Sequence, residues 1–162
     1  MTKKRVFHGT PHVFSMGAAT IRMGIFGPGF YFTTDLEGAR DYAKGGHRRV
    51  DAPTGTPGII ECDVEFQNPI DYYDVFPWKT GARGPYPSTK ELKDLRALLD
   101  YPDMTAQEAM RALKRLGYQT AKGIAYDGII VDFSRTKDSS LLGVQFYVAF
   151  DPSSLSCVRR VA

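Results

Sequence analysis

Two short strings constrain this chain more than any other feature: Phe7-His8-Gly9-Thr10 and Gly29-Phe30-Tyr31-Phe32-Thr33. A histidine that leaves a strand can donate or accept a hydrogen bond in its neutral form, which suits sugar hydroxyls. Gly9 has no side chain, so its N–H and C=O can approach a ligand amide closely. A helix is expected after the second string, and it would carry Tyr42. Two tyrosines are then available to stack on a flat ring, so the strings indicate a binding site for a planar ligand.

The residue pattern predicts an α+β fold. Segments rich in β-branched and aromatic residues predict strands at 6–8, 30–33, 58–66, 128–133 and 144–150. Capping-box patterns at Thr34–Glu37, Ser88–Glu91 and Thr105–Glu108 predict three helix starts. The second helix is expected to end near Asp100 and the third at Gly117. We expect these two helices to pack on one side of the sheet.

Composition limits the organisation of the chain. With 162 residues and 43% hydrophobic content, the chain can form one core, so a single domain over residues 1–162 is expected. The net charge of +3 is modest and spread out, which permits a nucleic-acid partner without requiring one. The basic amino terminus lacks an apolar stretch after it, so neither a signal peptide nor a membrane span is expected. A monomer is expected, and the use of only two cysteines predicts a reduced, cytoplasmic setting, with delivery into a host cell left open.

The order of these motifs resembles a known family. The histidine string, the tyrosine string, a helix with Ala39 and Tyr42, and a final strand at Tyr147-Val148-Ala149-Phe150-Asp151 are similar to the diphtheria-toxin-like and poly(ADP-ribose)-polymerase-like ADP-ribosyltransferases. The resemblance is strong over residues 6–42 and fair over residues 124–157, and it is closest to small bacterial and phage members. It implies two packed, mostly antiparallel sheets that form an NAD cleft, with flanking helices.

The resemblance also implies roles for individual residues. His8 would hold the adenosine-side ribose, with Thr10 in the same string. Gly9 would bind the nicotinamide carboxamide through its backbone, and Tyr31 and Tyr42 would pack on the nicotinamide ring.

The chain departs from the family at two positions. A serine that helps to hold the carboxamide is replaced by Ala39. The third signature residue, usually glutamate, falls on Phe146, which cannot stabilise positive charge on the sugar as nicotinamide leaves. Gln145 is a candidate replacement, but consecutive strand residues alternate faces, so Gln145 and Phe146 should point in opposite directions unless a bulge intervenes.

The resemblance implies a mono-ADP-ribosyltransferase that uses NAD as co-substrate, with a protein acceptor as the first expectation and a nucleic acid as the alternative. Phe146 and Ala39 keep a second hypothesis open, in which the chain binds NAD or ADP-ribose without transfer, or hydrolyses NAD. Residues 68–87 are expected to form a long ordered loop. In this family such a segment frames the acceptor site, so Tyr72, Tyr73 and Trp78 are candidates to contact a partner, while core packing or a lid is the alternative.

Other chemistries fit the sequence less well. His8 and His12 are four residues apart, but Gly9 and Pro11 between them argue against a metal-binding helix, and no glutamate lies where a zinc protease motif needs it, so no metal site is expected. The turn Gly27-Pro28-Gly29 is not followed by the residues that a dinucleotide or phosphate loop requires. The two cysteines, Cys62 and Cys157, have no paired spacing, which predicts reduced thiols, with Cys62 buried and inert.

Overall fold

The computed structural model describes residues 3–10, 23–24, 26–43, 58–101, 104–137 and 143–160. In these ranges the strands are β1 (Lys4–Thr10), β2 (Met23–Gly24), β3 (Gly27–Pro28), β4 (Phe30–Thr33), β5 (Gly58–Val64), β6 (Pro69–Asp71), β7 (Gly128–Asp132), β8 (Gln145–Ala149) and β9 (Leu155–Arg160). The helices are α1 (Leu36–Ala43), α2 (Tyr72–Val75), α3 (Lys90–Leu99) and α4 (Ala106–Leu116). Short 3-10 turns are η1 (Pro77–Thr80), η2 (Phe133–Arg135) and η4 (Pro152–Ser154). The predicted α+β class is confirmed.

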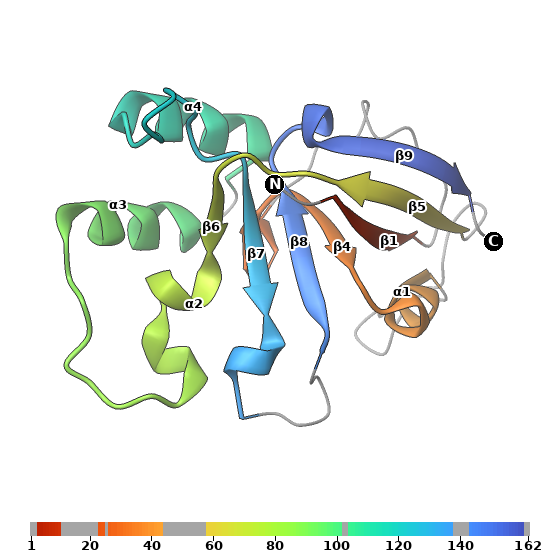
Figure 1. Ribbon diagram of the computed structural model, residues 1–162, viewed down its shortest axis with the longest axis horizontal. Coiled ribbons are helices and arrows are strands. Elements are labelled where there is room, and N and C mark those ends of the chain that lie inside the picture. Colours follow the sequence, from red (N-terminus) through yellow and green to blue (C-terminus); the bar gives the residue numbers. More distant parts are fainter. Residues whose placement is uncertain are drawn as a thin grey trace.

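In the described part of the chain, seven strands form one sheet in the order β6-β7-β8-β4-β1-β5-β9, and β2 pairs separately with β3. The β6–β7 pair is parallel and the other neighbours are antiparallel. The prediction of two packed sheets is wrong for these seven strands. β1 pairs with β4 at Phe7 and Thr33, so both halves belong to one continuous sheet. Figure 1 shows the sheet curling, so that β1, β5 and β9 run across the direction of β7 and β8.

The two faces of the sheet bury different cores. Tyr31 lies opposite Val148, which lies opposite Ile129, and all three contact the core beneath α2, α3 and α4. The alternate residues point to the other face, as strand geometry requires. There Phe32 packs with Val6 of β1 and with residues of β5 in a second buried cluster. The curled sheet therefore folds its two halves over this second cluster.

Helices α3 and α4 pack on the same side of the sheet, as predicted. Both helices contribute to the core that contains Val148, through Leu95, Leu98, Leu99, Ala109 and Leu113. Figure 1 shows them on the side of β6 and β7, whereas α1 lies near β1. Helix α1 packs Ala39 against Ile59, with Phe7 and Leu36 beside them. Among the described residues, every helix is too short or too polar to cross a bilayer.

The helix starts test the capping patterns. The predicted box at α4 is confirmed, because Thr105 and Glu108 each accept a hydrogen bond from the backbone N–H of the other. Helix α3 is capped by Thr89, which accepts from Leu92, and Glu91 instead accepts from the Tyr126 hydroxyl. The predicted box from Ser88 is therefore wrong by one residue.

The start of α1 also differs from its predicted box. The Asp35 carboxylate accepts from the backbone N–H of Glu37 at 3.2 Å, and the Glu37 side chain pairs with Arg40. The Thr34 hydroxyl is used elsewhere, because it accepts a hydrogen bond from the backbone of Gln145. Asp35, and not Thr34, therefore begins the helix.

Residues 68–87 are more regular than the predicted loop. They contain β6, α2 and η1. Tyr72 and Tyr73 are 2% and 4% exposed and belong to the core under the helices, so the interpretation of these two residues as partner contacts is wrong. Trp78 is 42% exposed. A three-residue strand and a one-turn helix are too short to give a periodic pattern, which explains why the sequence did not indicate them.

The expectation of a reduced thiol at Cys62 is also wrong. Cys62 is buried and disulfide-bonded, and Cys157 lies opposite it in the register of β5 and β9. Strand β9 was not predicted from the sequence, and without it nothing brings the two positions together.

Candidate functional site

Three neighbouring strands carry the three signature positions. His8 lies in β1, Tyr31 in β4 and Phe146 in β8, and the sheet order places β4 between the other two strands. Figure 1 shows these strands at the centre of the molecule, with α1 following β4. Three segments far apart in the sequence therefore lie on adjacent strands.

A hydrogen bond joins the histidine string to the tyrosine string. The Nδ1 atom of His8 lies 2.6 Å from the backbone oxygen of Tyr31. A carbonyl oxygen only accepts, so Nδ1 carries the proton and Nε2 holds the lone pair when the ring is neutral. Burial lowers the pKa of His8, although the bond to the Tyr31 carbonyl opposes this effect. His8 is therefore held as a neutral imidazole with one defined acceptor atom.

The Tyr31 side chain is fixed by the turn before its strand. Its hydroxyl donates to the backbone oxygen of Gly27 at 2.5 Å and accepts from the backbone N–H of Phe26 at 2.9 Å. The Phe26 ring lies 6.4 Å from the Tyr31 ring at an interplanar angle of 23°. The Phe26 ring therefore packs nearly parallel to the Tyr31 ring.

The side chains of His8 and Tyr31 leave the sheet on different faces. The His8 ring contacts Phe32 at 5.5 Å, and Val6, two residues earlier on β1, belongs to the same buried cluster as Phe32. Tyr31 packs against the core beneath the helices. The His8 ring therefore contacts the backbone of Tyr31, whereas the Tyr31 side chain lies on the sheet face opposite the His8 ring.

Phe146 lies on the Tyr31 face. Its ring is 5.7 Å from Phe26 and 5.0 Å from Phe133, and both contacts are edge-on. Tyr31 and Phe146 therefore border the same aromatic cluster, with Phe26 in contact with both rings.

Gln145 points to the other face, as strand alternation predicted. It lies opposite Asp132 in the register, and its Oε1 accepts from the Tyr147 hydroxyl at 2.8 Å. Burial acts to raise the pKa of Asp132, but hydrogen bonds from Ser134 and Gln145 hold it below its usual range. The ionised Asp132 and Gln145 thus form a polar group on the sheet face that also carries Phe32.

The remaining predicted positions have mixed outcomes. Gly9 is buried in β1, next to His8. Ala39 is 2% exposed and packs on Ile59, so it serves the contact between α1 and the sheet. Thr10 lies at the end of β1 and Tyr42 within α1, but their side chains lie outside the described part of the structure.

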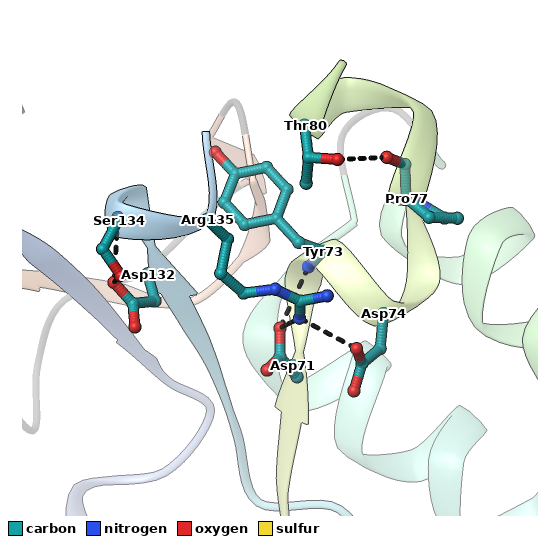
Figure 2. Close-up of polar contacts among 8 residues, drawn as sticks. All are labelled: Asp71, Tyr73, Asp74, Pro77, Thr80, Asp132, Ser134 and Arg135. Carbon is teal, nitrogen blue, oxygen red and sulfur yellow. Dashed lines mark hydrogen bonds and ion pairs between the residues drawn. The ribbon is translucent and has the colours of Figure 1, made fainter. Parts of the chain in front are cut away.

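An ion-pair cluster that no sequence pattern indicated joins η2 to the residues around the start of α2. Arg135 Nη1 lies 2.8 Å from carboxylate oxygens of both Asp71 and Asp74 (Figure 2). Tyr73 lies beside this guanidinium, and burial together with Tyr72 raises its pKa. The residues that pair are more than sixty positions apart in the sequence, so no local spacing could have revealed them. The cluster ties η2 to the start of α2.

Comparison of the chain with protein-family models, with curated proteins and with solved structures finds no match. The resemblance to ADP-ribosyltransferases therefore depends on the sequence motifs alone.

Proposed function

We propose that this chain is a mono-ADP-ribosyltransferase that uses NAD as its donor. The observation that carries the proposal is the hydrogen bond from His8 Nδ1 to the Tyr31 carbonyl. It fixes the tautomer in which Nε2 accepts, so a ribose hydroxyl can donate a hydrogen bond to Nε2. It also joins the two strings that carry the resemblance.

Binding of the donor would use few polar groups. Gly9 offers its backbone to the carboxamide, and the absence of a side chain there permits a close approach. Ala39 has no hydroxyl to add, and its methyl group is used in packing against Ile59. Tyr42 would stack on the ring, and Tyr31 would join it once Phe26, which packs against the Tyr31 ring, moves aside. Affinity for nicotinamide would then come from aromatic contact more than from hydrogen bonds.

The transfer step breaks the bond between C1 of the ribose and the nicotinamide nitrogen. Nicotinamide leaves with the bonding electron pair, and an acceptor nucleophile forms the new bond to C1 and loses its proton to solvent. Phe146 offers no charge to the oxocarbenium-like sugar, so catalysis would come from positioning the donor and the acceptor. A slow reaction is the expected result.

Labelled NAD and a host lysate test this function. We expect the native chain to transfer label, His8→Ala to lose most of the transfer, and Lys114→Gln, on the exposed side of α4, to retain it. Equal labelling by the native chain and by His8→Ala would reject the site. A mass-spectrometric search for the modified target then identifies the acceptor.

A specific observation favours the second candidate function, NAD binding without transfer. Phe26 contacts both Tyr31 and Phe146, so the aromatic cluster is already filled by a side chain of the protein itself. Calorimetry with NAD beside an assay for nicotinamide release separates the two functions. Tight binding with no release over hours supports a binding protein, whereas release without an acceptor indicates an NAD hydrolase.

A further inference from the structure

The segment 75–90 carries cations and exposed aromatic rings but no carboxylate. Asp74 precedes it and Glu91 follows it, and the segment contains Lys79, Arg83 and Lys90. From residue 81 to residue 90 every position is exposed.

Two aromatic rings of this segment face solvent together. Trp78 is 42% exposed and Tyr86 is 37% exposed, and their ring centroids are 5.7 Å apart. The Tyr86 hydroxyl donates to the backbone oxygen of Ala82 at 2.6 Å, which fixes the ring against its own turn. Phe76 packs edge-on against Trp78. The rings therefore form a preformed exposed pair.

Arg96 of α3 holds this segment at both ends. Its Nε donates to the backbone oxygen of Val75 at 2.7 Å, and its Nη2 donates to that of Pro87 at 2.9 Å. Its guanidinium also lies 4.9 Å from the centroid of the Trp78 ring. The aromatic pair is thus anchored to a core helix, so a ligand would not have to order the segment first.

The charge around the rings is positive. Among the described residues, Arg83 and Lys137 have no carboxylate within ion-pair distance, and the Lys137 side chain runs alongside Gly81. Asp71 and Asp74 pair with Arg135, and Asp94 pairs with Lys90. We call Trp78, Tyr86, Arg83 and Lys137 the Trp78 surface.

We propose that the Trp78 surface binds single-stranded nucleic acid. Bases stack on exposed aromatic rings, and cations beside those rings contact the phosphates between successive bases. A duplex hides its base faces, so the aromatic pair selects an unpaired strand. An acidic peptide could use the cations but has no planar groups for Trp78 and Tyr86. We also expect the bound strand to be the acceptor of ADP-ribose, and this expectation rests on the function proposed above.

Trp78 is the only tryptophan of the chain, so its fluorescence reports this surface alone. Titration of the protein with an unlabelled twelve-nucleotide thymidine strand is expected to quench the tryptophan emission. Anisotropy of a dye-labelled copy of the strand gives the affinity. We expect the logarithm of the binding constant to fall with the logarithm of salt concentration, and a hairpin duplex of equal charge to bind more weakly.

Variants separate stacking from charge. Trp78→Ala and Tyr86→Ala should each weaken binding by about tenfold, as expected for the loss of one stacked base. Arg83→Gln and Lys137→Gln should weaken binding and reduce the salt slope by about 0.7 each. Lys114→Gln removes the same charge from α4 and should leave binding unchanged. Circular dichroism checks that each variant folds. If Trp78→Ala does not fold, Arg83→Gln still tests the surface, because the Arg83 side chain is exposed.

Several outcomes would overturn the proposal. One is that the strand does not quench the tryptophan emission, and another is that the duplex binds as tightly as the single strand. A third is that Lys114→Gln weakens binding as much as Arg83→Gln does. Binding of a poly-glutamate peptide with equal quenching would indicate a protein partner instead. Labelled NAD then tests the acceptor role: His8→Ala should bind the strand normally but not label it. Binding without label in the native chain leaves the surface intact and rejects only the transfer.

Discussion

The Nδ1 atom of His8 donates a hydrogen bond to the backbone oxygen of Tyr31 across 2.6 Å. A backbone acceptor is insensitive to the identity of the residue that carries it, so this bond survives any change of the Tyr31 side chain. It does depend on β1 and β4 staying paired beside each other. The protonation of His8 is consequently a property of the sheet, and it can be tested through pH.

We predict that His8 makes the stability of the protein depend on pH below neutrality. Burial lowers the pKa of His8 in the folded protein from its ordinary value of about 6.5. The unfolded chain then binds the proton more tightly, so stability is complete above pH 6.5 and falls as pH falls toward the lowered pKa. Urea unfolding measures the free energy of unfolding at pH 7.5 and at pH 5. Between these two pH values the native chain should lose more of it than His8→Gln loses.

The comparison uses the difference between the two pH values, so a uniform loss of stability in the variant does not affect it. Parallel losses in both chains would contradict a shifted pKa at His8. The proposed NAD binding should also weaken as pH falls, because an imidazolium has no nitrogen that can accept a hydrogen bond from a ribose hydroxyl.

A second prediction concerns the turn before β4. Gly29 has a φ of +148°, and a Cβ there would lie 2.6 Å from Val148 Cγ1 and 2.8 Å from the backbone oxygen of Ala149. A backbone oxygen in a sheet cannot move aside, so Gly29→Ala should cost about 2 kcal/mol or more. Gly117→Ala is the control, with a φ of +79° and nothing within 4 Å, and it should cost about 1 kcal/mol. Equal urea midpoints for the two variants would show that the contact at Gly29 is harmless.

The sequence predicted those elements that have a local cause. β4 matches the predicted segment 30–33, and α4 begins with its capping box and ends at Gly117 in the left-handed conformation. The elements that were missed have long-range causes. β6 exists because it pairs in parallel with β7, and β9 exists because it pairs with β5. A three-residue strand has no period of its own, so only its neighbour identifies it.

The sequence predicted the strands of the candidate site, but not their arrangement. The strings placed His8 and Tyr31 on strands, but no pattern could show that β4 lies between β1 and β8. Alternation along a single strand did separate Gln145 from Phe146 correctly. The same rule could not compare His8 with Tyr31, because that comparison requires the register between two strands.

A third prediction concerns the ion-pair cluster in Figure 2. Asp71 accepts from the backbone N–H of Tyr73 at 3.1 Å as the N-cap of α2 and also pairs with Arg135, whereas Asp74 pairs with Arg135 without a capping role. An exposed ion pair contributes at most about 1 kcal/mol, and a cap adds about 1 kcal/mol. Asp71→Ala should therefore destabilise the protein by about 1 kcal/mol more than Asp74→Ala in urea unfolding.

Asp71→Asn provides the matched control for this pair. Asparagine keeps the capping oxygen and removes the charge, so it should resemble Asp74→Ala. High salt should shrink the effect of Asp74→Ala and leave the capping part of Asp71→Ala in place. If Asp71→Asn were as damaging as Asp71→Ala, the charge and not the cap would be the important contribution.

The fourth prediction concerns Phe146 in β8, the proposed third signature position. Phe146 packs edge-on against Phe26 and Phe133, so a carboxylate placed there would lose its water among aromatic rings. Phe146→Glu should destabilise the protein by about 2 kcal/mol or more, with a larger loss at pH 8 than at pH 5, because burial favours the protonated acid. It should not increase nicotinamide release. Phe146→Leu keeps an apolar side chain and should retain more of the native stability. A glutamate variant that is stable at pH 8 and releases nicotinamide faster would mean that Phe146 lines a hydrated cleft, and the aromatic cluster would then be a closed form of the NAD site.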